Sequence, residues 1–353
     1  MGEFLNSHGY LAAFLSFAIC AALLPLVRKG AVYFQVHDEP GHLKIHAVPI
    51  PRLGGVAMMA AVVCGLVAST YGSPNRLVHF YFALGLIWYA GFIDDLLNLP
   101  PVVRLLAQLA AGFLLSQTRW NLTLFGHPVL DSILTCLFVA VFVNAFNFLD
   151  GSDGIAGGVA ALVALGYAAV YATPTTGAGG AVAWSLLGAC LGFLAYNFPP
   201  ARIFMGDSGS TMLGFLIAFL SLDFYRVHHR LGSHWLLPLV FAGLPLMDFM
   251  LAIIRRLRKR VSPFTGDRGH FYDLLLDRGW SSLHVALGAY AVTGGLLLVG
   301  WLCIHPDWKI SILLLFVLAF LFAISLRNFE AIRQKSQLLF GGSEQSRPSA
   351  SDD

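Results

Sequence analysis

Acidic side chains stand at the ends of apolar segments in this sequence, where charged groups are uncommon. Asp94 and Asp95 close one apolar segment, and Asp207 opens another within Gly-Asp-Ser-Gly-Ser. Adjacent carboxylates repel each other, and a hard cation such as Mg²⁺ takes carboxylate oxygens as ligands. Two close carboxylates can also differ in protonation, which suits one of them to act as a base. Each motif also has a plain structural interpretation: a polar helix end for Asp94 and Asp95, and a helix N-cap for Asp207.

A second polar group closes the apolar segment that ends near residue 147. It contains Asn144, Asn147, Asp150 and Asp153. The two aspartates are three residues apart, so they share a face if the helix continues, with Cβ atoms about 5–6 Å apart. Glycines around them would let a bulky ligand approach the backbone. A loop with Asx-turns is the alternative interpretation.

Basic and histidine residues occur in two longer polar stretches. Lys44 and Arg52 lie in the first, where they are well placed to meet an anionic phosphate, although a solvated loop would look similar. His270 and Arg268 lie in the last such stretch, after a further apolar segment. These residues are candidates for contacts with an anionic substrate.

Asp248 differs from the other acids because it lies about two turns inside an apolar segment. An ionisable residue within a membrane is a functional hypothesis by default, and a structural partner such as Arg255 is the alternative. The basic run 255–260 is expected to touch anionic lipid, so no nucleic-acid partner is expected.

The composition is that of an integral membrane protein. The chain has 353 residues, of which 57% are hydrophobic and 12% charged, whereas a soluble domain carries about 25% charged residues. A spanning helix needs about 20 apolar residues, and strands would need a closed barrel. We therefore expect an all-α polytopic membrane protein with a single catalytic domain at 1–340 and a disordered tail at 341–353. About eleven spans are expected, at 10–27, 53–71, 78–93, 102–117, 129–147, 154–172, 180–197, 208–222, 235–254, 282–303 and 309–326.

Basic residues predict the orientation. Most of the 22 Lys and Arg fall on one side if the N-terminus lies outside and the C-terminus is cytoplasmic, as the positive-inside bias requires. The cytoplasmic loops are then 28–52, 94–101, 148–153, 198–207 and 255–281. The acidic motifs and His270 all fall on that face, although they were not used to assign it.

The polar motifs, taken in order, resemble a known family. They are Asp38-x-Pro40, Lys44-x-His46 through Arg52-x-Gly54-Gly55, Asp94-Asp95, Asn144 to Gly154, Met205-Gly-Asp207-x-Gly-Ser210, Pro245-x-x-Asp248 and Asp267-Arg-x-His270. The ordered set is similar to the polyprenyl-phosphate N-acetylhexosamine-1-phosphate transferases, which start bacterial O-antigen, teichoic acid and peptidoglycan lipid intermediates. The resemblance runs through nearly the whole chain, and the ordered set is highly specific.

The resemblance implies a reaction at the cytoplasmic face of the bacterial inner membrane. Undecaprenyl phosphate would attack the β-phosphorus of a UDP-N-acetylhexosamine and release UMP, with Mg²⁺, or alternatively Mn²⁺, neutralising charge. A homodimer is a further expectation. The implied catalytic residues are Asp94, Asp95, Asp150 and His270; the metal ligands are Asp207, Asn147 and Asp95; the substrate-binding residues are Lys44, Arg52, Asn144, Asp153 and Arg268.

The sequence departs from the family pattern after His270. Phe271 and Tyr272 stand where further histidines often occur. With this difference and the Pro-Ile-Pro-Arg loop at 49–52, the chain resembles the branch that acts on O-antigen or modified N-acetyl sugars. The alternatives are a phospho-MurNAc-pentapeptide transferase and, from another class, a cation-coupled transporter, which predicts ionisable groups near the membrane midplane around broken helices.

Overall fold

The chain is described by a computed structural model that covers residues 2–39, 48–69, 77–171, 178–228, 237–263, 265–266 and 268–303. These residues belong to a compact unit, Met1–His305. Lys44, the expected span at 309–326 and the expected tail at 341–353 lie outside the described residues.

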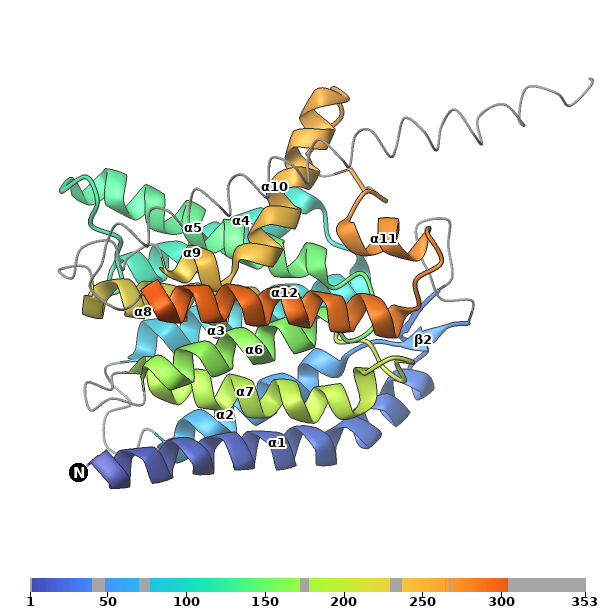
Figure 1. Cartoon of the computed structure of the whole chain (residues 1–353), viewed down its shortest axis with the longest axis horizontal. Helices are drawn as coiled ribbons and strands as arrows, with labels where there is room; N and C mark the ends of the chain where they lie inside the picture. The colour runs from blue at the N-terminus through green and yellow to red at the C-terminus, as the bar shows by residue number, and fades with distance from the viewer. Residues whose placement is uncertain are drawn as a thin grey trace, which may run out of the picture. The chain divides into compact units, whose positions relative to one another are not determined.

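Helices make up most of the described chain, as Figure 1 shows. They are α1 (Gly2–Tyr33), α2 (Gly54–Ser69), α3 (Val78–Leu97), α4 (Pro101–Ser116), α5 (Pro128–Leu149), α6 (Ile155–Val170), α7 (Ala178–Asn197), α8 (Gly206–His228), α9 (Leu237–Phe241), α10 (Gly243–Arg258), α11 (Phe271–Leu276) and α12 (Ser282–Cys303). Within the described residues, six helices (α1, α3, α5, α7, α8 and α12) are long and apolar enough to cross a membrane, and α2, α4 and α6 are shorter apolar helices. The expected all-α polytopic class is confirmed, while the number and orientation of the spans stay predictions.

One expected span, 235–254, is divided into two helices in the structure. The short α9 ends at Phe241, Ala242 interrupts the helix, and α10 then runs to Arg258. Figure 1 shows α10 inclined across the other long helices rather than parallel to them. Pro245 falls in the first turn of α10, where its missing N–H is tolerated. The arginines in the last turn of α10 disfavour a straight continuation through hydrocarbon.

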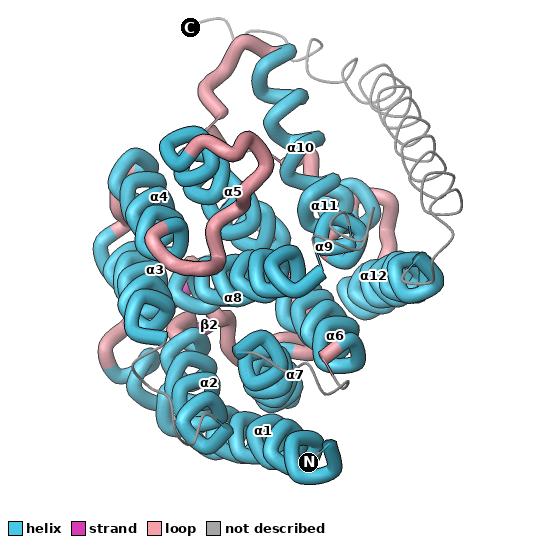
Figure 2. Tube along the Cα trace, turned by 90° about the vertical axis from the view of Figure 1, so that its left-hand side faces the viewer, coloured by secondary structure: helices cyan, strands magenta, loops and turns pink. Residues whose placement is uncertain are grey.

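Helix α8 forms the centre of the described bundle, and Figure 2 shows it surrounded by other helices. It packs against α2, α3, α5, α6 and α7, and 89% of the residues in its apolar 18-residue stretch are buried. A helix enclosed on all sides must satisfy its polar groups with protein partners. At the end remote from Asp207, the buried Asp223 accepts hydrogen bonds from Trp120, which follows α4, and from the N–H of Gly179 in α7. The polar side chains at the α8 ends therefore serve as attachment points for neighbouring helices.

A small sheet adjoins the first residues of α8. Strands β1 (His37–Asp38) and β2 (Ile50–Pro51) pair antiparallel. The carbonyl of Pro51 accepts a hydrogen bond from the N–H of Phe204 at 2.8 Å. This pairing holds Arg52 beside the segment that leads into α8, and it brings residues distant in sequence to the same end of the bundle.

Candidate active site

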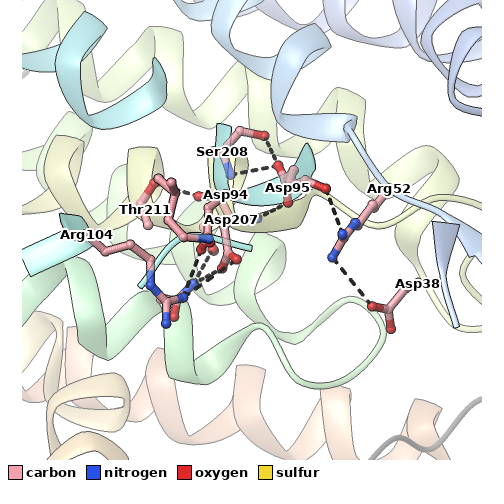
Figure 3. Close-up of polar contacts among 11 residues, drawn as sticks. Asp38, Arg52, Asp94, Asp95, Arg104, Asp207, Ser208 and Thr211 are labelled. Atoms are coloured by element: carbon pink, nitrogen blue, oxygen red, sulfur yellow. Dashed lines mark hydrogen bonds and ion pairs between the residues drawn. The ribbon is translucent and has the colours of Figure 1, made fainter. Parts of the chain in front are cut away.

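Asp95 at the end of α3 binds the first turn of α8, as Figure 3 shows. Its Oδ1 accepts the N–H of Asp207 at 2.8 Å, and its Oδ2 accepts the N–H and hydroxyl of Ser208 at 3.1 and 2.7 Å. Asp95 therefore acts as a cap for a helix other than its own, satisfying N–H groups that α8 cannot bond internally. Gly206 has φ 73°, and a Cβ there would overlap the Asp95 carboxylate. Glycine is thus required where the two helices meet.

Asp94 and Asp207 converge on one positive charge. The Nη1 atom of Arg104, from α4, lies 2.9 Å from Asp94 Oδ2 and 3.9 Å from Asp207 Oδ2, and the three side chains are seen together in Figure 3. Asp94 Oδ1 also accepts the N–H of Leu99 at 2.5 Å. The two carboxylates thus border a position suited to a cation. Arg104 was not predicted as a site residue; its sequence signal was a charge in an otherwise apolar segment.

The predicted asparagines lie on one face of α5 and support this arrangement. Asn147 donates from Nδ2 to Asp207 Oδ1 at 2.5 Å and to Ser210 Oγ at 3.0 Å. Asn144 donates from Nδ2 to Gln108 Oε1, also at 2.5 Å. Asn147 therefore orients the Asp207 carboxylate through its amide N–H groups, and Gln108 is a further polar residue that sequence reasoning missed.

Asp150 and Asp153 follow the end of α5 and have different surroundings. Burial raises the pKa of Asp150 well above its usual range, and the nearby carboxylates of Asp207 and Asp95 raise it further. The Asp150 carboxyl therefore holds its proton to unusually high pH. Asp153 instead accepts the N–H of Ala201 at 3.0 Å, which ties two loops together.

The predicted basic residues lie farther apart than the acidic residues around Asp207. Arg52 donates to the backbone oxygen of Asp95 at 2.7 Å, so it fastens β2 to the end of α3 (Figure 3). Arg268 donates to Asp277 at 3.0 Å on the exposed surface. Neither is among the residues that line the cavity described next, and Lys44 lies outside the described residues. Their contacts with substrate stay predictions.

A cavity of about 490 Å³ brings the remaining candidates together. That size falls within the range of small-molecule sites, about 300–1,000 Å³. Its apolar wall comes from α4, α5 and α10. Its polar wall includes Arg104, Gln108, Asn144, Asn147, Asp150, Arg256 and His270. Asn144, Asn147, Asp150 and His270, which were expected on separate segments of the chain, thus line one cavity.

His270 is held from behind by the acid inside α10. Its Nδ1 lies 2.6 Å from Asp248 Oδ2, and Asp248 Oδ1 accepts the N–H of Phe271 at 3.1 Å. The partner of Asp248 is thus His270, where the sequence alternative was Arg255. The Tyr272 ring lies parallel to the His270 ring, with centroids 5.3 Å apart and planes at 4°.

Arg256 lines the cavity, although the sequence shows it only as one member of a basic run. Its guanidinium carbon lies 4.7 Å from the centre of the Phe148 ring, and its Nη1 donates to the backbone oxygen of Pro263. The side chain is buried and lines the cavity. Arginines at a helix end are also typical of membrane orientation signals. Only the structure therefore reveals that Arg256 lines the cavity.

The site has few protein ligands for a metal but is compatible with Mg²⁺. The described residues contain no group of three or more His, Cys, Asp or Glu that could hold a metal ion. Mg²⁺, however, is often bound by one or two carboxylates together with waters and substrate phosphates. Asp94 and Asp207, which face the same positive group, supply that number of carboxylates.

Comparison with known proteins identifies the class. The model of glycosyl transferase family 4 matches residues 77–225, the stretch that contains Asp94, Asp150 and Asp207. A relative from Bacillus subtilis (strain 168), named a probable undecaprenyl-phosphate N-acetylglucosaminyl 1-phosphate transferase, is 31% identical over 296 residues, which is 80% of this chain and 81% of the relative. A decaprenyl-phosphate N-acetylglucosaminephosphotransferase from Mycobacterium tuberculosis (strain ATCC 25618 / H37Rv) is 33% identical over 309 residues, covering 76% and 74% of the two chains.

A more distant relative agrees. The undecaprenyl-phosphate alpha-N-acetylglucosaminyl 1-phosphate transferase of Escherichia coli (strain K12) is 27% identical over 332 residues, covering 86% of this chain and 87% of the relative. The chain belongs to glycosyl transferase family 4. Within it, the chain belongs with the polyprenyl-phosphate N-acetylhexosamine-1-phosphate transferases, as the sequence motifs predicted. This membership favours a transferase over the transporter alternative.

Proposed function

We propose that this protein transfers N-acetylglucosamine 1-phosphate from its UDP derivative to undecaprenyl phosphate or a similar polyprenyl phosphate, releasing UMP. The observation that carries the proposal is the convergence of Asp94 and Asp207 on one cationic position, next to a cavity large enough for a nucleotide-sugar. The relatives named above support N-acetylglucosamine as the sugar.

Mg²⁺, with Mn²⁺ as a substitute, would be held by Asp94 and Asp207. When bound, the ion would neutralise charge on the phosphates of the donor. Asn147 keeps the Asp207 carboxylate oriented by donating to its Oδ1. Asp95 keeps Asp207 in place by capping the first turn of α8. Whether Asp95 and Asn147 also bind the ion directly stays a prediction.

The chain's own residues would direct the displacement. An oxygen of the lipid phosphate forms a bond to the β-phosphorus of the UDP-sugar, and the bond from that phosphorus to UMP breaks. If Asp94 instead acts as the base that accepts a proton left on the attacking phosphate, Asp207 is the carboxylate left to hold the ion. Phosphoryl transfer depends mainly on positioning and charge neutralisation, so Arg104 and Arg256, which line the cavity, would bind phosphate oxygens. A protonated Asp150 would donate a hydrogen bond to the donor instead of repelling it.

The apolar wall of the cavity supports a lipid acceptor. Leu105, Leu137, Val141, Phe249 and Ile253 line it beside the polar groups. A polyprenyl chain needs an apolar surface, whereas its phosphate needs cations. We propose that the active site faces the cytoplasm at a bacterial inner membrane, because UDP-sugars are present in the cytoplasm. We also propose that the product serves the synthesis of a cell-envelope polysaccharide such as O-antigen.

The test is turnover by the purified protein. It is incubated with undecaprenyl phosphate, Mg²⁺ and a panel of UDP-sugars, and UMP release is measured. We expect release with UDP-N-acetylglucosamine and none with UDP-MurNAc-pentapeptide. Asp207→Asn is expected to slow release about 100–1,000-fold, as loss of a main electrostatic group does, while the protein still inserts in the membrane. Failure of every UDP-sugar to yield UMP would overturn the proposal.

A further inference from the structure

We propose that Asp248 and Tyr272 are positioning residues that hold His270 in one ring orientation, with the proton of Nδ1 bonded to Asp248 and Nε2 turned to the diphosphate of the donor. The inference rests on the proposed function for the identity of the ligand. It adds to that function the means by which the last large loop presents His270 to the cavity.

Asp248 fixes both the ring and the backbone of this loop. Its carboxylate is 2% exposed, and each oxygen has one partner: His270 Nδ1 at 2.6 Å and the Phe271 N–H at 3.1 Å. Because a carboxylate oxygen only accepts, the proton of the first bond lies on Nδ1. The tautomer of a histidine is set by the hydrogen bond that its other nitrogen makes.

Tyr272 fastens the same loop to the end of α5. Its hydroxyl donates to the carbonyl of Phe148 at 3.0 Å, while its ring lies parallel to that of His270. Gly151 leaves the space for this hydroxyl, because a Cβ at that position would overlap it. The contact places His270 against the segment of α5 that continues into Asp150.

Nε2 is consequently the ring nitrogen left for the ligand. Among the described residues, the hydrogen-bond partner of the ring is Asp248, on Nδ1, and His270 lines the same cavity as Arg104 and Asn147. A phosphate oxygen is an acceptor, so it would accept a hydrogen bond from a protonated Nε2. The ring is then doubly protonated in the complex, and the Asp248 carboxylate balances its charge, as buried charges require.

A double-mutant comparison tests the dependence of Asp248 on His270. Asp248→Asn leaves one amide oxygen for the two donors that the carboxylate now accepts and removes the negative charge, and we expect a loss of about 10–100-fold in kcat/KM, the range seen for residues that orient metal-binding histidines. His270→Gln keeps a donor near Nε2 that needs no such support. In the His270→Gln background, adding Asp248→Asn should therefore change kcat/KM less than about 3-fold. Effects that multiply would mean that Asp248 acts independently of His270 and would overturn the proposal.

A spectroscopic measurement separates this proposal from the proposed function. Histidine ¹⁵N resonances of the protein in lipid nanodiscs report which ring nitrogen carries a proton. The resonances that disappear in His270→Gln are those of His270. We expect Nδ1 to be protonated in the wild type, and the Nε2 signal to shift when UMP is added. Asp248→Ala, which offers no acceptor to Nδ1, should change the protonated nitrogen. An Nδ1 that is unprotonated in the wild type would refute the positioning, whereas a protein that shows these signals but releases no UMP would refute only the transfer reaction.

Tyr272 is tested by a graded series. Tyr272→Phe keeps the ring and loses the bond to Phe148, so we expect a smaller loss of kcat/KM than for Tyr272→Ala, which loses both. Gly151→Ala should resemble Tyr272→Ala, because it displaces the hydroxyl. Tyr33→Phe, at a side chain 81% exposed, is the matched control and should leave turnover unchanged. Wild-type kcat/KM and His270 resonances in Tyr272→Ala would contradict the role of this residue.

Discussion

The carboxylate of Asp95 bonds twice to Ser208, at 3.1 Å to its N–H and at 2.7 Å to its hydroxyl. These residues belong to α3 and α8, and Asp95 is 1% exposed. The pair therefore joins the end of one helix to the start of the central helix, in a place where water cannot replace a lost partner. This relationship also positions Asp207, which is next to Ser208 in sequence and accepts from Asn147.

Asp95→Asn is expected to destabilise the protein by about 1–3 kcal/mol, because the amide leaves buried N–H groups without an acceptor. The measurement is thermal unfolding in detergent, with and without Mg²⁺. An equal loss in both conditions would identify the capping role. A loss seen only with Mg²⁺ would instead support the predicted role of Asp95 as a metal ligand.

Ser208→Ala provides the comparison for Asp95. It removes the hydroxyl bond and keeps the backbone bonds, so we expect it to destabilise by about 1 kcal/mol. Combined with Asp95→Asn, it should add less than its own effect, because the two residues share a bond. Additive losses would show that the two side chains act separately.

Arg104→Ala is expected to strengthen divalent-metal binding and weaken catalysis. The Arg104 guanidinium lies near both Asp94 and Asp207, so it competes with a cation for their oxygens. Mn²⁺ binding, followed by electron paramagnetic resonance in the absence of substrate, should tighten several-fold in Arg104→Ala. Arg104→Lys, which keeps the charge, is the control. Unchanged or weaker Mn²⁺ binding in Arg104→Ala would rule out the competition.

The pKa of Asp150 predicts a pH dependence of stability. Because burial and neighbouring carboxylates raise this pKa in the folded protein, the folded state binds a proton that the unfolded chain releases near pH 4. Stability from this group is therefore full below about pH 4 and is lost as pH rises through the folded pKa. Asp150→Asn removes the loss.

Thermal unfolding across a pH series, in buffer with EDTA, tests this dependence. Asp150→Asn should match the wild type at about pH 4 and exceed its melting temperature by a few degrees at neutral and alkaline pH. A variant that is less stable than the wild type at alkaline pH would show that the Asp150 carboxylate is stabilising there.

The predicted orientation is tested by labelling. Single cysteines in place of Leu99 and Thr265, in a background without other cysteines, should be protected from membrane-impermeant thiol reagents added outside the cell. Both positions belong to the predicted cytoplasmic loops, at 94–101 and 255–281. Labelling from outside would reverse the orientation.

The fold class and the family of this protein could be predicted from its sequence alone. The length and spacing of apolar segments predicted an all-α membrane protein, because crossing a bilayer requires backbone hydrogen bonds within each helix. Ordered motifs around Asp94, Asp150 and Asp207 predicted the family. Both features are properties of short stretches of chain, so one sequence sufficed to recognise them.

The tertiary structure decided which partners these residues have. It brought Arg104 within 4 Å of both Asp94 and Asp207, and it paired Asp248 with His270. It also divided the expected span at 235–254 by a break at Ala242. Hydrogen bonds between residues far apart in the chain depend on how helices pack, and neither residue type nor spacing specifies that packing. The sequence by itself predicted which acids lie at the cytoplasmic end of the bundle. Only the tertiary structure decided which of these acids border a cation position and which hold helices together.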